Sequence, residues 1–389
     1  MEIIGKDNGV KQGFLTYPEF ARELENALTE QAITNAIPDQ LLKNIRHIVV
    51  TGNGDSYAAA LATKEFNSKM FMNCDYQVLR CLDVSRHHVF SAENPEQTLV
   101  MVISVSGSGS RVTEAMHRAA VKGCATLAIT ANPNSRMAAQ AQYVLQIPAA
   151  KAERFTPARQ AKSYVTALST TLLMGLHAGL VRGNITGEQA QLLRREMVDY
   201  VARVCTPEVL DRVDAQMETL AQTWKDYRGY GFVGGGSDFS TAYFGCAKFF
   251  ELCGSINSLN DSEDWCHIDF FQTNRQQLGT IVVASKNCAS FSRSWETILS
   301  MRKSQRNVLV ITDAAAEEFP QGVSVCTLPE TEHDYVNPLM QFLPLSMLAN
   351  YIAIARDYPY FGGMDASNPL FSQEGGINTI KSSEIQYFD

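Results

Sequence analysis

A short apolar run, Ile48–Val50, leads directly into a glycine turn, GNGDS over residues 52–56, and then into an alanine-rich stretch over residues 58–66. A buried strand that ends in glycines and is followed at once by a helix predicts a parallel α/β fold. The first N–H groups of such a helix have no partners and carry partial positive charge, so the junction is a candidate anion site. Gly54 and Ser56 are its predicted phosphate-binding residues.

A second junction of the same kind follows further along the chain, where the apolar run 99–103 leads into a loop over 104–110 and a helix-forming stretch. Its serine hydroxyls are predicted to bind the same anion, and they belong to Ser104, Ser106, Ser108 and Ser110. The alternative is a loop that only caps a helix, because serine is a common N-cap residue. Neither loop has the Lys-Ser/Thr pair of a P-loop, and Tyr57 replaces the third glycine of a dinucleotide fingerprint, so nucleotide binding is not expected.

Short runs rich in β-branched residues alternate with helix-forming stretches in both halves of the chain. They lie at 48–50, 100–103, 126–129, 143–147, 230–233, 279–284, 307–311 and 323–325. This alternation predicts two tandem α/β units, each a parallel sheet flanked by helices on both faces. The second series begins with Gly234–Gly236, a counterpart of the first glycine turn, which suggests an internal duplication; a purely structural turn is an equal alternative.

These patterns also divide the chain. We expect an N-terminal helical lead-in over 1–45, a first domain over 46–186, a helical linker over 187–228, and a second domain with the C-terminal tail over 229–389.

Composition narrows the class of protein. The formal net charge is −8 and no basic stripe is present, so a nucleic-acid partner is not expected. No apolar run is expected to span a membrane. The nine cysteines form no CxxC pair and the N-terminus has no signal-peptide pattern, which predicts reduced thiols and a cytoplasmic protein. Ligand pairs such as HxxxH do not occur, so neither a metal nor a cofactor is expected.

The strand, glycine turn and helix of each half, together with the SVSGSGS loop over 104–110, resemble the sugar isomerase (SIS) family over nearly the whole chain. The resemblance is strongest to the isomerase half of glucosamine-6-phosphate synthase and to the fructosamine-6-phosphate deglycases. In those enzymes a glutamate lies on the helix after the second glycine turn, and a histidine follows sixteen residues later. Glu251 and His267 have the same spacing here.

The resemblance implies a role for each of several residues. Glu251 would move the carbon-bound proton, and His267 would assist ring opening or protonate the leaving group. Lys381, in the C-terminal NTIKSSE stretch, would engage an open-chain carbonyl, and Gln160 would border the sugar. The simpler alternatives are a solvent-facing helix residue for Glu251, a partly buried histidine for His267 and a solvated tail residue for Lys381.

The sequence departs from the family pattern near two of these positions. Glu263 replaces the glycine that precedes the family histidine, and the Gly-Pro pair that follows the histidine is missing. Gly109 falls where the family has a threonine in the serine loop, so Ser108 or Ser110 is expected to take its place. These departures bear on the substrate more than on the fold.

The sequence therefore predicts a cytoplasmic enzyme that hydrolyses a fructosamine 6-phosphate to a hexose phosphate and a free amine or amino acid. An aminosugar-phosphate deaminase or isomerase is the first alternative, and a non-catalytic sugar-phosphate sensor is the second. Sensors of this kind usually carry a DNA-binding helix-turn-helix, whereas residues 1–45 are few and not basic. The chain begins with Met1-Glu2 rather than a nucleophilic cysteine, so glutamine-dependent amination is not expected. The resemblance also implies a homodimer with shared active sites.

Overall fold

The computed structural model describes residues 9–91, 93–149, 157–359, 362, 367–372, 376 and 383–388. The chain forms two compact units. The first-sheet unit comprises Ala21–Ala152, Ala161–Glu196 and Pro369–Asp389. The second-sheet unit comprises Met1–Phe20, Glu153–Gln160 and Met197–Asn368.

The first-sheet unit is built on a parallel five-stranded sheet with the strand order β2-β1-β3-β4-β5. Its strands are β1 (His47–Gly52), β2 (Asp75–Val78), β3 (Thr98–Ile103), β4 (Ala125–Thr130) and β5 (Tyr143–Gln146). β1 pairs with β3 from His47 opposite Thr98 to Gly52 opposite Ile103, so both strands end at the same edge of the sheet. The loops that follow these two strands therefore begin side by side.

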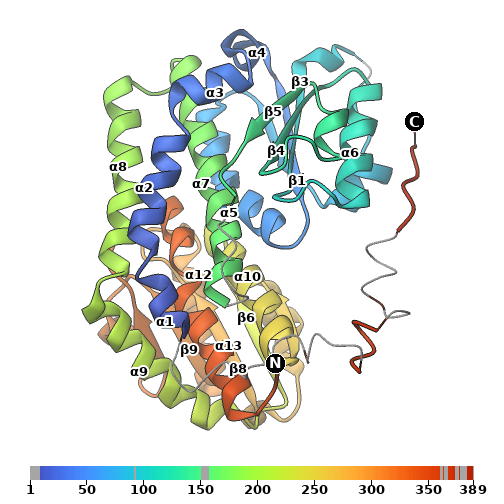
Figure 1. Ribbon diagram of the computed structural model, residues 1–389. Coiled ribbons are helices and arrows are strands. Elements are labelled where there is room, and N and C mark those ends of the chain that lie inside the picture. The colour runs from blue at the N-terminus through green and yellow to red at the C-terminus, as the bar shows by residue number, and fades with distance from the viewer. Residues whose placement is uncertain are drawn as a thin grey trace. The chain divides into compact units, whose positions relative to one another are not determined.

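Helices cover both faces of the first sheet, as the apolar strands require. α5 (Asp55–Met70) contacts β1 and β2, whereas α6 (Ser110–Val121) contacts β3 and β4. α7 (Pro157–Val181) packs on α5, where the Asn67 side-chain amide donates to the Thr171 carbonyl at 3.2 Å. Figure 1 shows α7 and α6 on opposite sides of the sheet. The helices α2 (Tyr17–Ala27), α3 (Glu30–Ala36) and α4 (Asp39–Asn44) lie between α1 (Gly9–Phe14) and β1 along the chain.

The second-sheet unit repeats this topology, with the strand order β10-β9-β8-β6-β7. Its strands are β6 (Gly229–Val233), β7 (Ile256–Asn260), β8 (Leu278–Val283), β9 (Asn307–Thr312) and β10 (Ser324–Thr327). Its helices are α1 (Gly9–Phe14), α9 (Pro207–Trp224), α10 (Ser237–Cys253), α11 (Asp264–His267), α12 (Phe291–Lys303) and α13 (Leu343–Ala355), and α8 (Gly187–Val204) enters it from the first-sheet unit. The prediction of two parallel sheets flanked by helices is confirmed.

Cysteine side chains are distributed through both units as free thiols. Seven of the nine cysteines are buried, and Cys74 and Cys266 are partly exposed. The thiols therefore behave mainly as small apolar core side chains.

Two stretches, Ala161–Val181 and Asp334–Ala355, are long and apolar enough by length and composition to cross a membrane, contrary to the expectation from the sequence. In each stretch 89% of the apolar window is buried inside the protein. Buried core helices of water-soluble proteins pass the same test, so these stretches are weak evidence for a membrane span.

Candidate functional site

The first glycine turn joins β1 to α5 with almost no room for side chains. Gly54 is the N-cap of α5 and has φ 52° and ψ −122°, a conformation that favours glycine. A Cβ atom on Gly52 would lie 2.7 Å from the Ser56 Cβ and 2.9 Å from the Ile103 carbonyl oxygen. Ser56 itself is only 8% exposed, and its N–H donates to the Asn53 carbonyl at 3.1 Å. The turn therefore brings the start of α5 close to the end of β3.

The serine loop, residues Ser104–Ser110, follows β3 and ends at the start of α6. The Gly107 N–H donates to the Ser104 hydroxyl at 3.2 Å, which closes the loop. The hydroxyls of Ser106 and Ser108 are 2.9 Å apart, and both residues are exposed. Exposed hydroxyls at a helix N-terminus favour an anionic ligand. Because β1 and β3 are neighbours, the structure brings this loop and the first glycine turn to one edge of the sheet.

Arg136 adds a positive charge to the serine loop. Its guanidinium donates to the Ser108 carbonyl oxygen, and its side chain is exposed. Sequence reasoning missed this residue because it follows β4, in a loop with neither a serine pattern nor a glycine motif. The signal that could have identified it is its place after the strand next to β3, at the carboxyl edge where ligands of parallel sheets bind.

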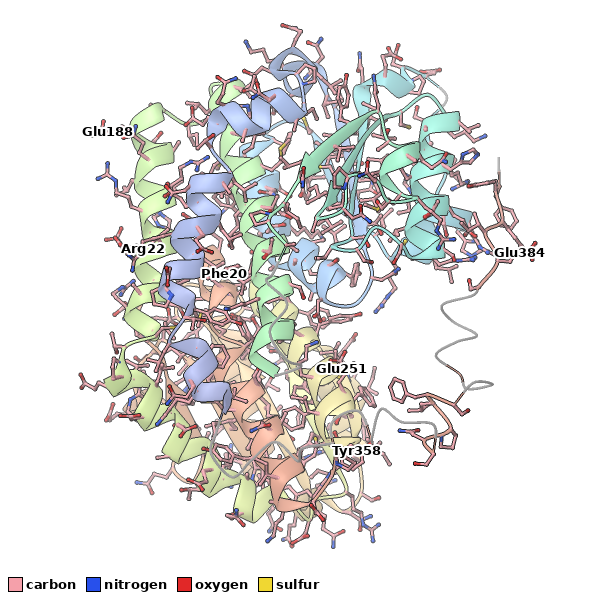
Figure 2. The ribbon with its side chains drawn as sticks, viewed as in Figure 1. Phe20, Arg22, Glu188, Glu251, Tyr358 and Glu384 are labelled. Carbon is pink, nitrogen blue, oxygen red and sulfur yellow. The ribbon has the colours of Figure 1, made fainter. Side chains whose placement is uncertain are left out.

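The C-terminal segment Ser383–Phe388, here called the tail segment, lies along α6. The Ser110 hydroxyl donates to the Ser383 carbonyl oxygen at 2.7 Å, and Arg111 donates to the Ser383 hydroxyl at 3.1 Å. Figure 2 shows Glu384 of this segment beside the side chains of α6. The Ser110 hydroxyl therefore donates its proton to the tail segment. The hydroxyls of Ser106 and Ser108 instead lie next to each other in the loop.

A buried carboxylate on α6 holds the middle of the tail segment. Glu114 is 1% exposed and accepts the Gln386 N–H at 2.8 Å. The guanidinium of Arg111 lies 2.9 Å from the same carboxylate, and that of Arg86 lies 3.5 Å from it. Charge-assisted contacts of this kind are stronger than neutral hydrogen bonds.

Aromatic contacts hold the end of the tail segment. The Tyr387 ring lies 3.9 Å from the His117 ring between centroids, and the Arg86 guanidinium lies 4.7 Å from the Phe388 ring centroid. Lys381, the predicted carbonyl-binding residue, lies outside the described residues, as does the side chain of Gln160. The predictions for these two residues therefore stay predictions.

Glu251 lies near the C-terminal end of α10 and pairs with a lysine. The Lys248 ammonium is 2.8 Å from the Glu251 carboxylate and 4.8 Å from the Phe244 ring centroid. Lys248 is 4% exposed in its side chain and Glu251 is 31% exposed. Glu251 is therefore only partly buried, whereas its neighbours Phe249 and Leu252 point into the core. Lys248 was missed, although its spacing of three residues from Glu251 places both on one helix face.

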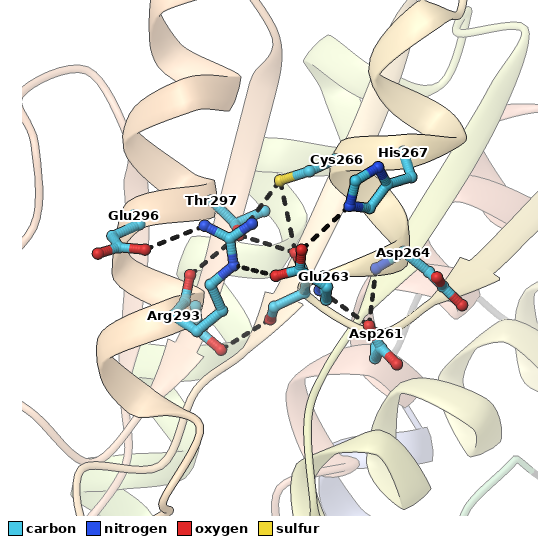
Figure 3. Close-up of polar contacts among 10 residues, drawn as sticks. Asp261, Glu263, Asp264, Cys266, His267, Arg293, Glu296 and Thr297 are labelled. Atoms are coloured by element: carbon cyan, nitrogen blue, oxygen red, sulfur yellow. Dashed lines mark hydrogen bonds and ion pairs between the residues drawn. The ribbon is translucent and has the colours of Figure 1, made fainter.

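His267 ends the short helix α11 and pairs with the residue that departs from the family pattern. Its Nε2 atom is 3.0 Å from a Glu263 carboxylate oxygen, and 68% of its side chain is exposed. The second Glu263 oxygen accepts a hydrogen bond from Arg293 at 2.6 Å (Figure 3). Hydrogen bonds from His267 and then from Arg293 lower the pKa of Glu263. Glu251 and His267 thus contact different partners, Lys248 and Glu263.

Comparison with known proteins relates this chain to the SIS family. Residues 40–176 match the SIS domain family. The isomerizing glutamine–fructose-6-phosphate aminotransferase of Thermotoga maritima is 22% identical over 345 residues, covering 85% of this chain and 52% of that protein. The same enzyme of Halobacterium salinarum is 26% identical over 206 residues, covering 53% of this chain and 33% of that protein. The matched part of this chain thus corresponds to about half or less of each relative.

Solved structures show the same fold at low sequence identity. The C-terminal domain of glucosamine-fructose-6-phosphate aminotransferase from Francisella tularensis has a TM-score of 0.79 and 17% identity, and covers 91% of this chain and 97% of that chain. Tagatose-6-phosphate ketose/aldose isomerase from Escherichia coli has a TM-score of 0.71 and 15% identity, with coverages of 92% and 95%. Residues 40–176 therefore belong to the SIS domain family, and the chain has the tandem SIS fold.

Proposed function

We propose that the chain is an enzyme that acts on a phosphorylated ketosamine, hydrolysing a fructosamine 6-phosphate to a hexose phosphate and a free amine or amino acid. The observation that carries this proposal is the pair of loops at the carboxyl edge of the first sheet, with exposed Ser106 and Ser108 at the start of α6 and Arg136 beside them. The names of the related proteins refer to fructose 6-phosphate and tagatose 6-phosphate, which supports a phosphosugar as the ligand.

The phosphate would be held mainly by neutral donors. Ser56, Ser104, Ser106 and Ser108 supply hydroxyls, the first turns of α5 and α6 supply N–H groups, and Arg136 supplies a positive charge. The Ser110 hydroxyl would join them only after exchanging its contact with Ser383 for one with the ligand. Binding an unreactive phosphate in this way positions the carbons that react.

Proton transfers would then release the amine. The carboxylate of Glu251, which lies 2.8 Å from the Lys248 ammonium, would remove a proton from C1 of the open-chain ketosamine. Returning a proton to C2 gives an imine between C1 and the nitrogen. Water adds to C1, the C1–N bond breaks, and a proton moves to the departing amine, which leaves an aldose phosphate. His267 would assist ring opening, and Lys381 would hold the carbonyl of the open chain.

A second copy of the chain would complete each site. His267 projects into solvent and is paired with Glu263 rather than with Glu251, so it is available to a neighbouring subunit. We therefore propose a homodimer in which each active site combines residues of two copies.

We also propose a cytoplasmic location, which the nine free cysteines support.

An aminosugar-phosphate isomerase or deaminase is the second candidate. It is supported by the likeness in fold to a ketose/aldose isomerase, and its proton transfers would use the same Glu251 carboxylate. A sugar-phosphate-binding regulator is the third candidate, and it would bind the anion without turnover.

A product screen tests these candidates. Purified protein is incubated with 6-phosphofructosyl amino acids and with glucosamine 6-phosphate, and the products are identified by mass spectrometry. Release of an amino acid and a hexose phosphate supports the proposal, whereas ammonia and fructose 6-phosphate from glucosamine 6-phosphate indicate the deaminase. Thermal stabilisation by sugar phosphates without turnover indicates the regulator.

Matched variants show whether the activity belongs to this site. Glu251→Gln should abolish turnover, while Glu188→Gln, the same chemical change on an exposed helix residue, should retain it (Figure 2). Equal activity of Glu251→Gln and Glu188→Gln would reject the role of Glu251.

A further inference from the structure

The second glycine turn repeats the backbone of the first, but it carries a carboxylate where the first carries a hydroxyl. Gly236, the N-cap of α10, has φ 57° and ψ −131°, against φ 52° and ψ −122° for Gly54. Two residues after each glycine, the N–H donates to the carbonyl three positions back, at 3.1 Å in both turns. The residue that donates is Ser56 in the first turn and Asp238 in the second. Asp238 therefore occupies the position that Ser56 has in the candidate phosphate site.

The Asp238 carboxylate receives the donors that a bound anion would use. It is 1% exposed. One oxygen accepts the Ser285 N–H at 2.8 Å, and the other accepts the Ser285 hydroxyl at 2.5 Å and the Gln341 side-chain amide at 3.1 Å. Ser285 lies just beyond β8, in the loop that corresponds to the serine loop beyond β3. Backbone and hydroxyl donors at the end of this strand are thus turned toward the protein's own carboxylate.

The surroundings of Asp238 offer hydrogen-bond donors to an anion, and within the described residues no cation is paired with it. All three donors to its carboxylate are neutral, and the Gln341 amide is itself oriented by the Thr241 hydroxyl, which donates to it at 3.1 Å. The N-terminus of α10 contributes its partial positive charge. The buried hydroxyl of Ser237, at the first position of α10, has no hydrogen-bond partner among the described residues. A buried carboxylate is costly without such donors, so these hydrogen bonds are what allow the Asp238 side chain to be buried here.

We infer that Asp238 is an internal substitute for a phosphate, and that the second-sheet unit holds an anion site closed by this side chain. Each chain would then bind a phosphorylated ligand only at the first glycine turn. Removing the carboxylate would leave Ser285, Gln341 and the start of α10 with unsatisfied donors, which an external phosphate could bind. This inference rests on the phosphate site of the proposed function for its comparison, and the experiment below distinguishes the failure of one from the failure of the other.

The test counts inorganic phosphate ions bound per chain, by equilibrium dialysis with radiolabelled phosphate. Asp238→Ser recreates the residue of the first turn, and we expect it to bind one more phosphate per chain than the unchanged protein. Asp238→Asn is the matched control: it fills the same volume without charge, and we expect no additional phosphate. The reciprocal change, Ser56→Asp, should close the first turn. We expect this variant to bind one phosphate per chain fewer than the unchanged protein.

The comparison between Asp238→Ser and the unchanged protein decides the inference. A folded Asp238→Ser protein with no additional phosphate would overturn it, whatever the first turn binds. If Asp238→Ser unfolds in the absence of phosphate, its melting temperature should rise with phosphate concentration more than that of Asp238→Asn, and equal rises would also overturn the inference. An unchanged protein that binds no phosphate, together with an Asp238→Ser protein that binds one, would support the inference and count against the proposed function.

Discussion

Burial and hydrogen bonding act on Asp238 in opposite directions, and burial has the larger effect. Burial raises the pKa of its carboxyl group to about 6, while the hydrogen bonds from Ser285 and Gln341 lower it. The nearby Asp313 carboxylate raises it further. A carboxyl group whose pKa is raised on folding binds its proton more tightly in the folded protein, so it stabilises the fold most at acidic pH.

This shift predicts a pH-dependent stability. As the pH rises from about 4 to about 6, the unchanged protein should lose about 2 to 3 kcal/mol of unfolding free energy relative to Asp238→Asn. Urea unfolding of both proteins at pH 4, 5, 6 and 7 measures the difference. Parallel curves for the two proteins would mean that the carboxyl group titrates at its ordinary pKa.

Lys248 is the residue whose removal should most affect Glu251 without unfolding the protein. Replacing the lysine with methionine keeps much of its buried volume but removes the ammonium 2.8 Å from the Glu251 carboxylate. We expect the kcat of the proposed reaction to fall about 100-fold, the scale of one acid-base contribution. We expect KM to change little, because the phosphate binds elsewhere. Steady-state kinetics of Lys248→Met check this, and an unchanged kcat would show that Glu251 acts without its partner.

At the scale of helices and strands, side chains on one face of α6 hold the tail segment against the helix. Its fixed points on α6 are Ser110, Glu114 and His117, which follow each other at helical spacing along one face. The segment therefore depends on side chains of α6 for its position.

Loss of the aromatic contact should loosen the tail segment. Tyr387→Ala removes the ring that packs against His117. We expect the Gln386 amide to exchange its hydrogen about 2- to 10-fold faster, in line with the strength of an aromatic pair. Tyr387→Phe keeps the ring and is the control, with exchange close to that of the unchanged protein. Equal exchange in all three proteins would show that the Tyr387 ring does not help to hold the segment.

The central strands and the edge strands β5 and β10 were predictable from the sequence, whereas the edge strands β2 and β7 were not. β3 reads TLVMVI and is wholly buried, so its apolar run is unmistakable. The edge strands β2 and β7 read DYQV and INSLN, and their mixed polarity reflects partial exposure to solvent. Neither edge strand was expected, because periodicity and composition signal burial rather than pairing.

The candidate site was predictable only where it depends on local patterns. The glycine turn and the serine loop are each a continuous stretch of sequence, so each could be recognised by itself. The structure places both at one sheet edge. The contact of Glu114 with Gln386 joins positions far apart in the chain, and no local pattern signals it. The contact between His267 and Glu263 was not predicted either. The sequence shows that Glu263 departs from the family pattern, but whether two side chains at α11 meet depends on their orientation.

At the scale of the whole molecule, the proposal that two copies share each active site can be tested with mixtures of variants. Glu251→Gln and His267→Ala should each be inactive as a homodimer. After unfolding and refolding together in equal amounts, about half of the dimers are mixed, and each mixed dimer has one intact site of two. The mixture should therefore recover about one quarter of the activity of the unchanged protein. No recovery in a mixture shown to contain mixed dimers would place both residues of a site on one copy.

The distribution of the free thiols offers a way to observe the site without engineering a new residue. Seven thiols are buried, and burial raises the pKa of the partly exposed Cys74 thiol. Cys266 is the other partly exposed thiol, and it directly precedes His267. A thiol-reactive fluorophore applied to the native protein would therefore attach preferentially beside the histidine, where its emission reports on the surroundings of that residue.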